Sequence, residues 1–177
     1  MAVTATRLLV GARDVQVDAV YVGGLSGGVQ LLYAAELFKH KVDQHLGTVA
    51  VDKIDEEIRI KFTMSEATLE NLRIAMAQPS WALSTAATDI LNIGSQRILP
   101  AAHSVIITGK APGTDQTRTI TIPKAIVEEG GTHAYTKDGR TEYEVTMLCL
   151  VDTTKAEGFQ VLSIADSDAV FAFSVSA

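Results

Sequence analysis

The strongest constraint on the fold is a strict alternation of polar and apolar residues over 57–64, followed directly by a helical pattern. Because strand side chains point alternately to opposite faces, this segment is predicted to be a half-buried strand. Its apolar face would hold Ile58, Ile60, Phe62 and Met64, and its polar face Glu57, Arg59, Lys61 and Thr63.

Residues 65–78 are predicted to form one amphipathic helix. Ser65 is suited to accept the free amide hydrogens of a first turn, and Leu69, Leu72 and Met76 follow at spacings of three and four. Pro79 would end the helix. A single helix after a half-buried strand predicts a helix that covers a sheet.

Most of the remaining chain has strand and turn patterns, so the predicted fold is mainly β. We expect an antiparallel β-sandwich or a partly open barrel flanked by one helix. The 177 residues suffice for one well-buried core and are taken as a single domain, 1–177. It would carry an N-terminal arm over 1–14, a long loop or extended hairpin over 39–55, and a C-terminal hairpin over 158–177.

The composition disfavours some classes of function but does not identify one. The net charge of −6 disfavours tight binding to nucleic acid, because neutralisation of phosphates normally supplies that affinity. The single cysteine, Cys149, lies in an apolar run and is predicted to be a small buried hydrophobe. No apolar run is long enough to span a bilayer, and residues 1–10 lack a signal-peptide core, so a soluble protein that is not exported is expected.

A possible nucleophile is Ser26, within the Gly-x-Ser-x-Gly pattern of residues 24–28. In a hydrolase this pattern forms a sharp turn between a strand and a helix, and His133 would follow in the correct chain order. Too few elements precede Ser26 for that fold, and the next segment has a strand pattern. A flexible turn is therefore the favoured interpretation.

The other candidate sites have simpler explanations. His40, Asp43 and His45 suggest a metal site, but neither a strand nor a helix brings residues five apart to one ion. His103 has no cysteine or carboxylate at ligand spacing and receives no role. Trp81, just after the helix, is predicted to plug the end of the core. No cofactor or metal is expected.

Several segments together resemble the major tail tube protein family of long-tailed bacteriophages. The resemblance covers roughly residues 15 to 165 and depends on the order and spacing of its parts. The segments are Val22 to Val29, Val42 to Gln44, Ile58 to Leu72, Arg118 to Ala125, Tyr135 to Gly139, Glu144 to Leu150 and Asp152 to Thr154.

This resemblance implies a structural role in a virion tail and no enzymatic activity. Hexameric rings of the subunit would stack into a hollow tube that conducts double-stranded DNA into the host, without sequence-specific binding or membrane insertion. The implied partners are further copies of the chain, a tape-measure protein, and tail-tip and terminator proteins. The subunit would be made in the host cytoplasm.

Two sets of residues acquire candidate roles from the resemblance. The polar strand faces are candidates for the wall of the lumen, with a solvent-facing outer surface as the alternative for each: Glu57, Arg59, Lys61, Thr63, Thr119, Thr121, Glu142, Glu144 and Thr146. The long loop would reach the next ring or a neighbour, through Phe38, Lys39, His40, Lys41, Val42 and Asp43.

Three functions compete at this point. A tail tube subunit predicts rings or tubes of high mass. A β-sandwich binding or receptor module predicts a stable monomer with a ligand, and a small serine hydrolase predicts covalent labelling of Ser26. The tail tube subunit is the favoured hypothesis.

Overall fold

A computed structural model describes residues 11–41, 48–84, 88–94, 100–111, 116–130 and 141–167. One α-helix, α1 (Leu69–Ala75), and one 3₁₀ turn, η2 (Ser80–Ala82), accompany the strands. The strands are β1 (Ala12–Val17), β2 (Val20–Tyr21), β3 (Leu25–Lys41), β4 (Thr48–Met64), β5 (Leu83–Ser84), β6 (Ile90–Leu91), β7 (Ala102–Lys110), β8 (Thr117–Gly130), β9 (Tyr143–Cys149) and β10 (Ser163–Asp166).

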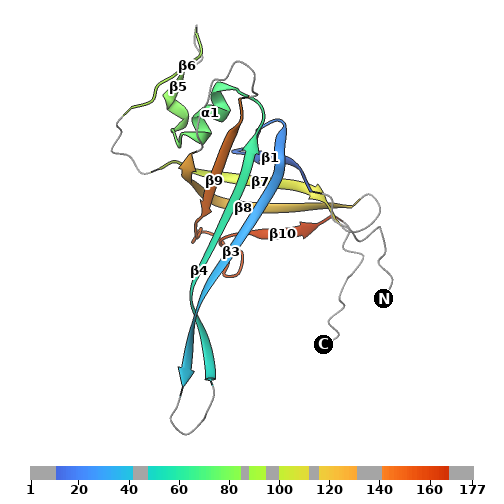
Figure 1. The fold of residues 1–177 in the computed structure, drawn as a ribbon, viewed down its shortest axis with the longest axis vertical. Coiled ribbons are helices and arrows are strands. Elements are labelled where there is room, and N and C mark those ends of the chain that lie inside the picture. Colours follow the sequence, from blue (N-terminus) through green and yellow to red (C-terminus); the bar gives the residue numbers. More distant parts are fainter. Residues whose placement is uncertain are drawn as a thin grey trace.

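Eight of these strands form one antiparallel sheet in the order β2-β1-β7-β8-β9-β4-β3, with β10 paired to β8. In Figure 1 the β3, β4 and β9 strands cross over β1, β7, β8 and β10, so the sheet folds over on itself. Helix α1 lies at one end of this folded sheet, beside the small β5–β6 pair. The expected antiparallel β fold with one flanking helix is confirmed.

The core lies between the two crossing halves of the sheet. On β4 the residues from 58 to 64 alternate between buried and half-buried, and β9 alternates in the same way from Tyr143 to Cys149. Paired strands bring Phe62 opposite Val145 and Ile60 opposite Met147, and all four side chains are almost fully buried. The predicted strand and its apolar face are therefore confirmed.

Cys149 ends strand β9 and is buried. Burial raises the pKa of its thiol to about 11, which keeps the group protonated at neutral pH. The prediction of a small buried hydrophobe at this position is confirmed.

The helix begins later than predicted. Thr68, not Ser65, is the N-cap: its side-chain oxygen accepts a hydrogen bond from the Asn71 amide at 3.1 Å. The amide of Ser65 instead donates to the Gly24 carbonyl at 2.8 Å. Because this bond continues the pairing of β3 with β4, Ser65 ends the strand rather than capping the helix.

The predicted loop over 39–55 is an extended hairpin where the structure describes it. Residues 39–41 and 48–55 belong to β3 and β4, which pair from Leu25 and Met64 outward to Lys41 and Thr48. Figure 1 shows this hairpin extending well beyond the rest of the molecule along its longest axis. Residues 42–47 lie outside the described part of the chain.

Both predicted terminal segments need correction. Residues 12–14 are not part of an arm, because they belong to β1, which pairs with β7. Within the predicted C-terminal hairpin, 158–177, residues 163–166 form β10, which pairs with β8. Residues 158–162 form turns and bends rather than a strand, and residues 1–10 and 168–177 lie outside the described part of the chain.

Candidate assembly surface

The outer part of the β3–β4 hairpin, residues 35–41 and 48–56, is called the arm here. It carries large apolar side chains that are each half exposed or more: Leu37, Phe38, Val49, Val51 and Ile54. A two-stranded hairpin normally needs a third strand or a covering layer for stability. The arm therefore presents apolar surface on strands that no other described part of the chain covers.

The two faces of the arm differ in charge. Directly paired residues of antiparallel strands share a face, and Leu37 pairs with Lys53 while Lys39 pairs with Val51. These four residues form what we call the basic arm face. The opposite face pairs Glu36 with Asp55, Phe38 with Asp52 and His40 with Ala50, and we call it the acidic arm face.

Polar contacts run along both arm faces. On the acidic arm face, His40 Nε2 lies 2.7 Å from Asp52 Oδ2, and the rings of Phe38 and His40 pack edge to face with centroids 4.8 Å apart. On the basic arm face, Lys53 forms an ion pair with Glu56. Lys39 forms no ion pair within the described residues.

The candidate inter-ring residues are partly described. Phe38, Lys39 and His40 lie on the arm, and Lys41 ends β3. Val42 and Asp43 lie outside the described residues, as does His45 of the candidate metal site. His40, the described member of that site, contacts Asp52 instead.

The candidate lumen residues of β4 and β9 lie on one face. Lys61 pairs with Thr146 and Thr63 with Glu144, on the side of the sheet opposite the core. Arg59 bonds to Glu128 of β8 through Nε at 2.6 Å and Nη2 at 3.1 Å. Further ion pairs join Arg59 to Glu57 and Lys61 to Glu144.

This polar face contains carboxylates that the sequence analysis did not single out. Glu128 and Glu129 come from β8, and Glu129 lies opposite Thr146. With Glu57 and Glu144 they outnumber the cations Arg59 and Lys61, so the face carries an excess of negative charge. Hydrogen bonding to Arg59 lowers the pKa of Glu128, which keeps that carboxylate ionised.

The other lumen candidates lie apart from this group. Thr119 and Thr121 occupy the first half of β8, where the strand pairs with β7 and β10 rather than with β9. Glu142 precedes β9 and is half-buried.

Ser26 is a strand residue. It lies in β3 opposite Thr63, and the register of the two strands shifts between Ser26 and Val29. Gly27 and Gly28 supply the positive φ angles of this irregularity, 74° and 79°. The strand, turn and helix of a nucleophile elbow are therefore not present here, and His133 lies outside the described residues.

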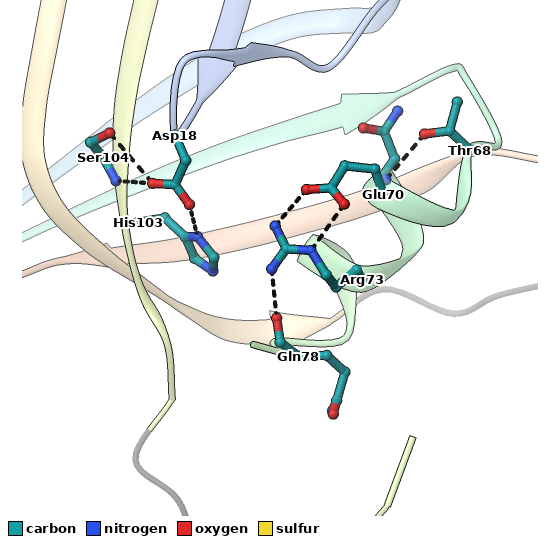
Figure 2. Close-up of polar contacts among 8 residues, drawn as sticks. Asp18, Thr68, Glu70, Arg73, Gln78, His103 and Ser104 are labelled. Carbon is teal, nitrogen blue, oxygen red and sulfur yellow. Dashed lines mark hydrogen bonds and ion pairs between the residues drawn. The ribbon is translucent and has the colours of Figure 1, made fainter. Parts of the chain in front are cut away.

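A partly buried polar cluster lies near helix α1 (Figure 2). His103 of β7 is 2% exposed, and its Nδ1 lies 2.6 Å from Asp18 Oδ2 in the β1–β2 turn. The Ser104 amide donates to Asp18 Oδ1 at 2.9 Å. Burial alone would raise the pKa of Asp18, but the hydrogen bonds from His103 and Ser104 outweigh it and lower that pKa.

Arg73 of α1 lies beside this pair (Figure 2). It is 3% exposed, and its Nη2 and Nε bond to the Glu70 carboxylate at 2.6 and 3.1 Å, while Nη1 donates to the Gln78 carbonyl at 2.8 Å. His103 Nε2 is buried and has no hydrogen-bond partner in the described structure. We interpret the cluster as structural, because its charged groups are occupied in fixing the β1–β2 turn and the end of the helix.

The core opens at a cavity of about 200 Å³ between the two halves of the sheet. Val29, Ile107 and Ile120 contribute apolar walls, and Arg118 lies among the lining residues. Arg118 is itself held by Asp166 through bonds of 2.6 and 2.7 Å. The cavity is thus mainly apolar, and of its two lining cations, Lys110 and Arg118, Arg118 is already paired.

Trp81 does not plug the core. Its side chain is 61% exposed, and the neighbouring Ala82 is the buried residue of η2. The Asn92 amide donates to the Ala82 carbonyl at 2.9 Å, so residues 81–82 and 92–93 lie side by side. Ile90 and Ile93 are also more than half exposed, which makes this end of the molecule a second apolar surface.

Within the described residues, no group of three His, Cys, Asp or Glu side chains is arranged to hold a metal ion. No helix in this part of the chain is long and apolar enough to cross a membrane. No protein-family model matches the chain, and no curated protein matches its sequence.

Proposed function

We propose that the chain is a structural subunit of a phage tail tube. In this proposal rings of the subunit, hexameric by the family resemblance, stack into a conduit for double-stranded DNA. The observation that carries the proposal is the arm, which exposes apolar side chains on strands that need a covering surface. A further copy of the chain would supply that surface.

The charge of the polar face supports a conduit function. A wall with excess carboxylate repels phosphate, whereas a basic wall would retain DNA through counterion release. The face formed by β4, β9 and β8 has this excess, and its cations are held by Glu57, Glu128 and Glu144. Ion pairs of this kind leave little free positive charge for passing phosphates.

The partners and location of the subunit follow from the same proposal. Ring stacking has no intrinsic limit when the two faces of a ring differ, so a tape-measure protein would set the tube length. Tail-tip and terminator proteins would close the two ends. The subunit would reside in the virion tail after synthesis in the host cytoplasm.

The experiment is electron microscopy of the purified full chain over a range of concentrations, with sedimentation velocity for mass. Rings or hollow tubes wide enough for a DNA duplex would support the proposal. A monomer at every concentration that binds a small apolar ligand would instead favour a binding module, for which the cavity beside Ile107 and Ile120 is the candidate site. Labelling of Ser26 by an organophosphonate would favour the hydrolase.

A shortened hairpin tests the role of the arm. Residues 37–54 are replaced by Asn-Gly, so that a two-residue turn joins Glu36 to its present partner Asp55. We expect a folded subunit with nearly unchanged thermal stability that forms no tubes, because the core residues of β4 are retained. Normal tubes from this variant would refute the assembly role of the arm.

A further inference from the structure

Two apolar surfaces lie at opposite ends of the molecule. The arm forms one end of the longest axis, and the β5–β6 pair lies at the other (Figure 1). We call the second surface the end patch and define it by Trp81 and Ile93, which are 61% and 57% exposed and flank the Ala82–Asn92 hydrogen bond, together with the exposed carboxylate of Asp89. Exposed aromatic and aliphatic side chains grouped in this way are typical of interaction sites.

The charges of the two surfaces are complementary. On the basic arm face, Lys39 has no ion-pair partner in the described structure and stands between Leu37 and Val51. Asp89 of the end patch also forms no ion pair with a described residue. The acidic arm face, with Glu36, Asp52 and Asp55, would be repelled by the Asp89 carboxylate. Charge therefore favours a contact through the basic arm face.

We infer that the basic arm face of one copy binds the end patch of another copy. This inference rests on the proposed tube function and specifies the surface that receives the arm. A head-to-tail contact covers both apolar surfaces with a single type of interface, whereas a two-fold contact between arms would leave the end patch exposed. A head-to-tail contact leaves one free arm and one free end patch on the growing assembly, so it repeats, and it forms an open stack where its rotation does not close a ring.

The test uses two variants that each lose one side of the contact. The arm variant is Leu37→Ser with Val51→Ser, and the end variant is Trp81→Ser with Ile93→Ser. All four side chains are at least half exposed, so both variants are expected to fold. Val151→Ser, at another exposed apolar position, is the matched control and should assemble as the wild type does.

Neither variant alone should stack, but a mixture should form one contact. The intact arm of the end variant would bind the intact end patch of the arm variant, giving a discrete complex that does not elongate. Sedimentation velocity of each variant and of the mixture measures this. An end variant that stacks normally, or a mixture with no complex, would overturn the inference.

The same mixture tests the charge pairing. Asp89→Lys, added to the arm variant, should weaken the mixed complex about tenfold, equivalent to ~1.4 kcal/mol. Lys39→Glu, added to the end variant, should then restore it. Unchanged affinity would show that the basic arm face does not meet Asp89 and would overturn the assignment.

The inference and the proposed function can fail separately. Wild-type tubes together with a normally stacking end variant would contradict only the end patch as receiving surface. A wild-type chain that stays monomeric in every preparation would contradict both.

Discussion

The inner and outer halves of the β3–β4 hairpin differ in how their side chains are buried. In the inner half, β4 alternates between buried and half-buried residues and Phe62 is 1% exposed. In the arm every described side chain of β4 from Thr48 to Glu56 is exposed, and Phe38 on the partner strand is 52% exposed. The same ladder of backbone hydrogen bonds therefore continues from a region held by packing into one that packing does not hold.

This difference separates the surface that stabilises the fold from the surface proposed for assembly. Burial of apolar area is the main favourable term in folding, so the inner half of the hairpin contributes to the free energy of unfolding and the arm contributes little. The apolar side chains of the arm are consequently available to another surface. Paired substitutions in the two regions test this difference.

The largest effect is expected at the core. Phe62→Ala should lower the free energy of unfolding by about 3–5 kcal/mol, because it removes a buried aromatic ring and leaves a cavity. Phe38→Ala, the matched change on the arm, should alter it by less than ~0.5 kcal/mol. Equilibrium urea unfolding of both variants measures the contrast, and similar losses would mean that the arm is packed in the monomer.

The two histidine–aspartate pairs provide a second contrast. Asp18→Ala should lower the free energy of unfolding by about 1–3 kcal/mol, because it leaves Nδ1 of the buried His103 side chain without its partner. Asp52→Ala removes the corresponding partner of exposed His40, where water can replace it. Urea unfolding of the two variants should show a change only for Asp18, and equal changes would contradict the comparison.

Lowering the pH should remove the contribution of ionised Asp18 to the free energy of unfolding. Its pKa is lowered in the folded protein, so its stabilisation is present above the unfolded value of about 3.9 and disappears as pH falls through the folded pKa. The difference in urea midpoint between the wild type and Asp18→Asn should be largest near neutral pH and shrink below about pH 4. A difference that stays constant with pH would argue against an ionised Asp18.

The smallest effect is expected at the helix start. Thr68→Ala should destabilise the protein by about 1 kcal/mol, because Thr68 accepts the hydrogen bond from the Asn71 amide. Ser65→Ala is the control and should have little effect, since the backbone of Ser65, not its side chain, makes the bond to Gly24. Thermal unfolding of the two variants decides between the two capping positions.

Much of the fold outside the arm could be predicted from local sequence patterns. Residues 58–64 alternate because one face of β4 is buried, so the sequence carries the signal directly. The helix start could not be resolved locally, since both Ser65 and Thr68 are good caps and the choice depends on the pairing of Ser65 with Gly24. Residues 39–55 were predicted as either a long loop or an extended hairpin. Strands that are exposed on both faces need no period-two pattern, so the sequence did not decide between the two.

The candidate surfaces were predicted less completely. The polar face of β4 and β9 follows from alternation, but Glu128 joins it only because β8 bends and pairs with β9. His103 meets Asp18 across 85 positions of sequence, a separation at which no local spacing is informative. Trp81 was misplaced because a tryptophan after a helix is usually buried, whereas here Ala82 occupies the buried position.

The first of the two register shifts in the arm has a geometric consequence. Between Glu36 and Leu37 the ladder skips Ile54, and such bulges bend a strand and increase its twist. The strand direction thus changes at this bulge, while the inner half of the hairpin is held in the core through Ile60 and Phe62. In the proposed tube, the direction in which each arm leaves its subunit would therefore be set at this bulge.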